Sequence, residues 1–79
     1  MSVTEILRDM RLAVENAPRN GYIAELHIQI IKHAHNLQTV KGREFCDALG
    51  IGPSFATEFS QMRKIAPRLR DAGLVVERL

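Results

Sequence analysis

The stretch Gly50-Ile51-Gly52-Pro53 constrains the fold of this chain most, because it forces a change of direction between two segments with helical patterns. Glycine adopts backbone conformations that are strained for other residues, and proline is favoured at the first position of a helix. We therefore expect one helix to end at Gly50 and the next to open at Gly52 and Pro53, with Ile51 as a buried plug in the turn. The inward-facing residues are Val40, Phe45, Ala48 and Leu49 before the turn, and Ala56, Phe59 and Met62 after it. Two amphipathic helices joined in this way predict a helix-turn-helix.

The segment before this motif is also predicted to be helical. Ser2 followed by Glu5 has the pattern of a capping box, and apolar residues at helical spacing indicate a first helix over residues 3–16. A second helix is expected over residues 22–36. Apolar side chains cover more than half of its circumference, so we expect it to be central in the core or half in an interface.

Three features describe the remaining segments. Thr39 is expected to be the N-cap of the third helix. Pro67 is expected to break or kink the fourth helix, and Gly73 to cap what remains. Residues 74–79 form a strand-like or docking tail that is too short for a wing. The predicted fold class is all-α, with four to five short helices around a helix-turn-helix core and no complete wing.

Length and composition predict one small cytoplasmic domain. The 79 residues form a single helix-turn-helix-like domain over 1–79, with its core at about 22–73. The one cysteine, Cys46, cannot form an internal disulfide and is typical of a reducing cytoplasm. The N-terminal segment lacks the continuous apolar block of a signal peptide, and no segment is apolar enough to span a membrane.

The sequence contains no pattern that predicts catalysis. His27, His33 and His35 point in different directions around one helix, so we expect no metal site. A phosphate-binding loop, a paired-carboxylate site and a nucleophile motif are all absent. We therefore expect no cofactor and no enzymatic activity.

The start of the fourth helix determines the functional prediction, because exposed side chains there normally enter the major groove of DNA. Ser54 and Gln61 can hydrogen-bond to bases, but Glu58 is repelled by phosphates and Phe55 offers at most a contact to a thymine methyl group. Aromatic, Met and Arg residues are favoured at protein interfaces. We therefore predict a protein-binding surface, formed by Ser54, Phe55, Glu58, Gln61, Met62 and Arg63.

Two alternatives remain open. The net charge of +2 arises within residues 41–79, so a DNA-binding surface is the second choice; its residues would be Ser54, Gln61, Arg63, Lys64, Arg68 and Arg70. Arg63 and Lys64 come late in the helix, where they can contact phosphates but not bases. Alternatively, Phe55 packs against the first or second helix, and the basic segment is only a solvated face.

The central part of the chain, from about Tyr22 to Met62, resembles short helix-turn-helix-like regulatory proteins of alphaproteobacteria. The matching residues are Phe45, Leu49, Gly50, Ile51, Phe55, Ala56, Thr57 and Glu58. The chain is also similar to the quorum-sensing antiactivators of rhizobial conjugative elements. This resemblance implies a transcription-regulatory protein that sequesters a LuxR-type activator and represses conjugative transfer.

The same resemblance leaves other functions open. A DNA-binding helix-turn-helix regulator or an excisionase-like protein, in either case as a homodimer, is the alternative. An antitoxin-like or phage accessory module is a third interpretation. We expect no membrane partner in any of these cases.

Overall fold

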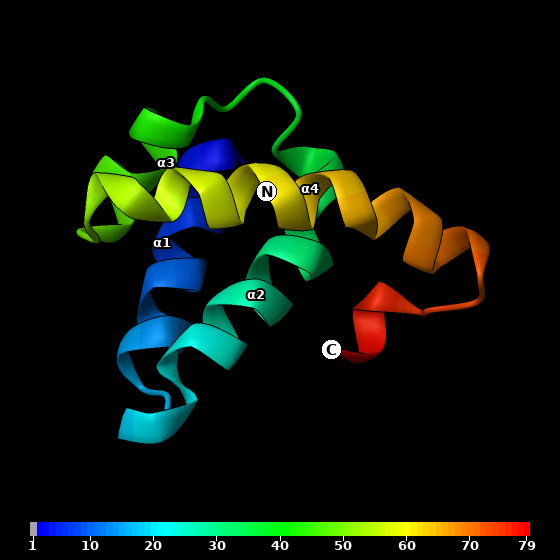
Figure 1. Ribbon diagram of the computed structural model, residues 1–79, viewed down its shortest axis with the longest axis horizontal. Coiled ribbons are helices and arrows are strands. Elements are labelled where there is room, and N and C mark those ends of the chain that lie inside the picture. Colours follow the sequence, from blue (N-terminus) through cyan, green and yellow to red (C-terminus); the bar gives the residue numbers. More distant parts are fainter. Residues whose placement is uncertain (1) are drawn as a thin grey trace.

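The computed structural model describes residues 2–79 and consists of helices joined by short connections (Figure 1). The four α-helices are α1 (Val3–Glu15), α2 (Tyr22–His33), α3 (Gly42–Leu49) and α4 (Ala56–Asp71). Four single turns of 3-10 helix accompany them: η1 (Arg19–Gly21), η2 (Ala34–Asn36), η3 (Pro53–Phe55) and η4 (Val76–Arg78). No strand occurs within residues 2–79, which confirms the predicted all-α fold without a complete wing.

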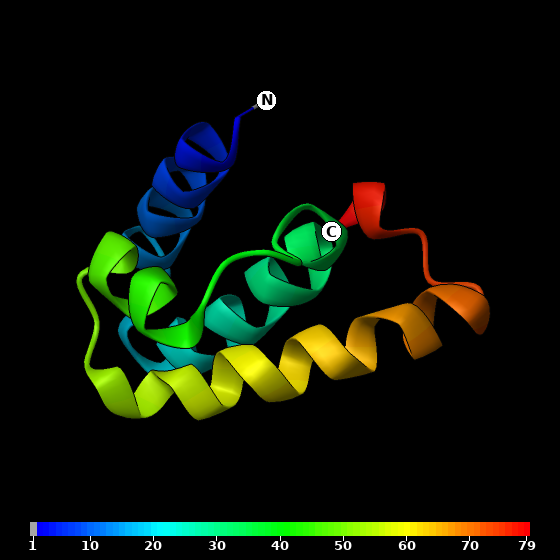
Figure 2. The same ribbon diagram turned by 90° about the horizontal axis from the view of Figure 1, so that it is seen from above.

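The α2 helix lies at the centre of the arrangement, because it contacts both α1 and α4. In Figure 1, α1 and α2 run side by side and α4 crosses them; Figure 2 shows α4 along one side of the pair. The α3 helix contacts α1 and α4. At the centre of the core, the Phe45 and Phe59 rings stack with their centroids 4.2 Å apart, which holds α3 against α4. The expected position of the second helix in the core is thus confirmed.

Local signals in the sequence account for the helix ends. The Glu5 backbone N–H donates to the Ser2 hydroxyl at 3.2 Å, as expected of an N-cap. Gly50 has a φ of +68° and Gly73 a φ of +110°, a region that favours glycine. The N–H groups of the residues that follow, Ile51 and Leu74, donate back to carbonyls five residues earlier, both at 3.0 Å. Both glycines therefore stop their helices, as predicted.

The structure corrects where the third helix begins. It begins at Gly42 after extended Lys41, not after Thr39. The residues before it instead form a turn in which the Val40 N–H donates to the Leu37 carbonyl at 3.1 Å. Gly42 also allows α3 to approach α4 closely, because a Cβ at this position would lie 2.9 Å from the Ala56 Cβ.

Two further expectations about the fold are corrected. Pro67 lies inside α4 and does not end it. The fixed φ of proline is compatible with a helix. The last turns of α4 are held to the domain by Ala66, which is buried, and Leu69, which is half-buried. Within the predicted strand-like or docking tail, residues 76–78 form η4 rather than a strand. The docking alternative is confirmed, because Val76 is buried next to α2. The hydrophobic core includes Ile6, Leu7, Met10 and Val14 of α1.

Candidate functional site

One face of α4 and of the turn before it is exposed to solvent. Five exposed side chains, which we call the α4 stripe, occupy it: Ser54, Thr57, Gln61, Lys64 and Arg68. Their spacing of three and four residues places them on one side of a helix. Within residues 2–79, none of them forms a side-chain hydrogen bond or an ion pair. The stripe therefore presents hydroxyl, amide and cationic groups, and no carboxylate, to solvent.

Phe55 and Glu58 are directed toward α2. For Phe55 this confirms the alternative in which it packs against the second helix, whereas Glu58 was expected to be exposed. The Phe55 ring is half-buried and meets the Tyr22 ring edge-on, with centroids 6.3 Å apart. A Glu58 carboxylate oxygen lies 2.8 Å from His27 Nε2, and the two side chains are 36% and 30% exposed, respectively. At about 100° per residue, Glu58 lies roughly 90° around the helix from the middle of the α4 stripe. Its carboxylate is thus paired within the domain and lies beside the stripe.

Arg63 also has its partners inside the molecule. Its guanidinium donates to the Leu37 carbonyl at 2.8 Å and to the Val40 carbonyl at 2.6 Å. The guanidinium carbon lies 4.5 Å from the centroid of the Phe59 ring. The sequence assigns Arg63 to a protein partner or to phosphates, but in the structure it ties α4 to the connection between α2 and α3. Met62, its neighbour, is half-buried against the core.

The sequence reasoning missed one member of the α4 stripe, Thr57. The sequence spacing could have identified it, because Thr57 lies three residues after Ser54 and four residues before Gln61, on the same side of a helix. The stripe thus combines Ser54, Gln61, Lys64 and Arg68 from the predicted residues with Thr57, while Phe55, Glu58, Met62 and Arg63 face the domain.

Comparison with known families agrees with this architecture. The sequence profile that describes the HTH-like domain, where HTH stands for helix-turn-helix, matches residues 2–72. The chain belongs to the HTH-like domain family. Neither a curated protein nor a solved structure matches the chain.

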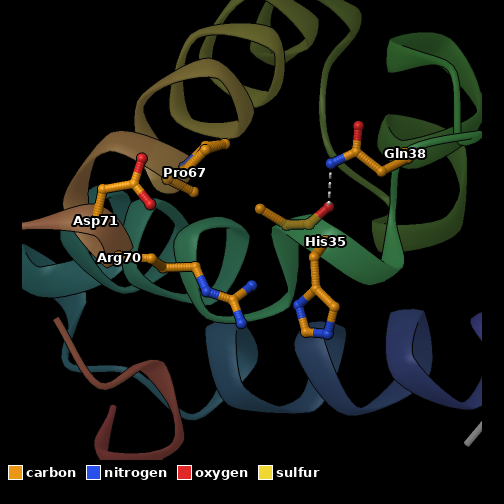
Figure 3. Close-up of a pocket in the computed structure, with 7 residues that line it drawn as sticks. His35, Gln38, Pro67, Arg70 and Asp71 are labelled. Carbon is orange, nitrogen blue, oxygen red and sulfur yellow. Dashed lines mark hydrogen bonds between the residues drawn. The ribbon is translucent and has the colours of Figure 1, made fainter. Parts of the chain in front are cut away.

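Arg70 of this HTH-like domain lies on a different surface from Arg68. Two residues of helix separate the two side chains by roughly 160°. Arg70 lines a pocket of about 220 Å³, shown in Figure 3, together with His35, Gln38 and Asp71. The buried residues Ala34 and Ala66 and the exposed Pro67 complete its lining. The basic segment of the sequence is therefore divided between two surfaces.

The titratable residues of the HTH-like domain do not gather into a metal site. Within residues 2–79, no group of three or more His, Cys, Asp or Glu side chains is placed to hold an ion. Burial lowers the pKa of His33, with a smaller contribution from Lys32. Burial also raises the pKa of the Cys46 thiol, as expected for a small core residue, and Asp47 adds to the effect. No helix within residues 2–79 is long and apolar enough to cross a membrane.

Proposed function

We propose that this chain is a small transcription regulator that contacts duplex DNA through the α4 stripe. The observation that carries the proposal is the absence of a carboxylate from this stripe, since Glu58 is paired with His27 beside it. A Glu58 carboxylate that pointed into the groove would be repelled by the DNA phosphates. With Glu58 turned toward α2, a helix with hydroxyl and amide groups followed by two cations is suited to the major groove.

The dimensions of α4 support this assignment. From Ser54 to Arg68 the stripe extends for about 20 Å at a rise of 1.5 Å per residue, while the major groove is about 12 Å wide. When Ser54 and Thr57 lie in the groove, Lys64 and Arg68 therefore reach its phosphate edge. With few phosphate contacts per chain, binding is expected to be modest and salt-dependent, and a homodimer would double the number of contacts.

A gel shift titrated with salt tests this function. We expect the purified protein to bind a mixed-sequence duplex at low salt, with affinity falling as salt rises. Lys64→Ala and Arg68→Ala should each weaken binding to all sequences alike, because both side chains contact phosphates. Arg70→Ala is the matched control, since it removes the same charge from another surface and should leave the affinity nearly unchanged. Equal losses for Arg68→Ala and Arg70→Ala would contradict a specific role for the stripe.

A second candidate function is sequestration of a LuxR-type activator, as the resemblance to quorum-sensing antiactivators implies. Exposed isoleucines favour it: Ile23 and Ile28 on α2 are 44% and 38% exposed, and Ile65 on α4 is 42% exposed. Such apolar side chains would be covered by a protein partner. In both proposals the chain binds a macromolecule and catalyses no reaction.

Pull-down with a LuxR-type activator tests the second candidate. Ile28→Ser should weaken capture, whereas Leu12→Ser, which alters a still more exposed residue on α1, should not. Capture that is unchanged by Ile28→Ser would remove the support for this interface.

A further inference from the structure

We infer that the α4 stripe selects A·T base pairs, with Gln61 as the residue that determines this specificity. The inference rests on the proposed DNA-binding function and deepens it. It depends on which side chains of the stripe are placed over the bases, which of them are free, and what each can recognise.

Geometry divides the stripe into a base-contacting part and a phosphate-contacting part. Ser54, Thr57 and Gln61 span about 10 Å of helix, which fits within the major groove, about 12 Å wide. Lys64 and Arg68 follow one and two turns later, where the groove is bounded by phosphates. The three uncharged side chains are therefore the ones that meet base edges, because recognition helices contact bases through their N-terminal residues.

Each of these three side chains has a defined preference. The amide of Gln61 can bind adenine at N6 and N7 with two hydrogen bonds, and the Thr57 methyl group can contact the methyl group of thymine. The hydroxyl of Ser54 accepts or donates to either pair. Recognition of guanine in the major groove most often uses Arg or Lys, and neither occurs among these three positions. The combination therefore favours A·T over G·C.

Gln61 is also the glutamine that the fold leaves free. The chain has three glutamines, Gln29, Gln38 and Gln61. The Gln29 amide donates to Glu25 at 2.8 Å and the Gln38 amide donates to the Ala34 carbonyl at 3.3 Å. The Gln61 amide is exposed and makes no hydrogen bond within residues 2–79, so both of its polar atoms are available to a base.

Competition between duplexes at fixed salt tests the inference. The duplexes share length and flanks and differ in a core of A·T or G·C pairs, placed at each register. We expect the wild-type protein to prefer the A·T core by roughly 5- to 150-fold, the discrimination typical of one bidentate contact. Gln61→Ala should remove most of this preference without changing affinity for the G·C core. Gln61→Arg should shift the preference toward guanine, whereas Lys64→Ala should weaken both duplexes equally.

A modified base separates direct contact from an effect of DNA shape. Replacing adenine by 7-deazaadenine in the core removes the N7 acceptor and keeps Watson–Crick pairing. It should weaken wild-type binding and leave Gln61→Ala binding unchanged. An A·T preference that is undiminished in Gln61→Ala would overturn the inference.

Two further outcomes separate this inference from the function on which it rests. Equal, salt-dependent binding to both cores would overturn the inference and leave the DNA-binding function standing. Absence of binding to any duplex at low salt would overturn both.

Discussion

Replacement of Arg63 by alanine is expected to destabilise the fold, although the sequence places this residue in a basic surface segment. Its guanidinium donates to two backbone carbonyls that lie 26 and 23 residues earlier in the chain. It therefore fixes the connection between α2 and α3, and with it the position of the helix-turn-helix on the rest of the domain.

The magnitude follows from the contacts that would be lost. The Leu37 carbonyl would keep a second donor, the Val40 N–H, whereas the Val40 carbonyl has Arg63 as its donor. A hydrogen bond to a charged group contributes about 1.5–3 kcal/mol, and a cation–π contact such as that with Phe59 adds about 0.5–1 kcal/mol. We expect Arg63→Ala to lower the free energy of unfolding by about 2–4 kcal/mol, out of about 4–12 kcal/mol for a chain of this length.

Thermal unfolding followed by circular dichroism measures this loss. A decrease of about 10–25 °C in Tm is expected for Arg63→Ala, and roughly half of that for Arg63→Lys, which keeps the charge but not the planar fork. Lys64→Ala is the matched control, because Lys64 is adjacent and exposed and its side chain makes no hydrogen bond or ion pair within residues 2–79. It should change Tm by only a few degrees. If Arg63→Ala and Lys64→Ala had the same small effect, the structural role assigned to Arg63 would be refuted.

Three further predictions concern single residues. Gly50→Ala should lower the free energy of unfolding, measured in urea, by about 1–2 kcal/mol, because the left-handed backbone at φ +68° is strained for alanine. Gly21→Ala is the control and should not lower it, because φ is negative at Gly21. Since burial lowers the pKa of His33, the unfolded chain binds its proton more tightly, so stability should be full above about pH 6.5 and decline below it; His33→Gln should flatten this dependence. The Cys46 thiol, whose pKa is raised by burial, should react with a disulfide reagent only as fast as the domain opens, and rapid labelling of the folded protein would contradict its core position.

Most of the backbone of this domain was predictable from local signals, apart from the start of α3 and the continuation of α4 through Pro67. The orientation of the surface residues was not predictable in this way. Gly50 and Gly73 end helices because the chain needs a positive φ at these positions, which glycine adopts without help from distant residues. Phe55 and Glu58, in contrast, are oriented by Tyr22 and His27, which are distant in sequence. In addition, residues 53–55 form the 3-10 turn η3 and not the first turn of an α-helix. Because a 3-10 helix is wound more tightly, the side chains of α4 lie at different angles from those expected of an α-helix that begins at Pro53.

One side of α4 holds the helix to the rest of the domain, and the other side is the exposed α4 stripe. Substitutions on the two sides should therefore have different effects. Phe59, Glu58 and Arg63 hold the helix to α3, to α2 and to the connection between them. The α4 stripe makes no hydrogen bond or ion pair within residues 2–79, so substitutions along it should alter binding without a large cost in stability. If the stripe binds DNA as proposed, a change such as Gln61→Arg should therefore redirect recognition on an unchanged fold. A substitution at Arg63 would instead weaken every partner interaction indirectly, by moving α4 as a whole. The two classes of variant are separable in one experiment, because only the second should lower Tm in parallel with affinity.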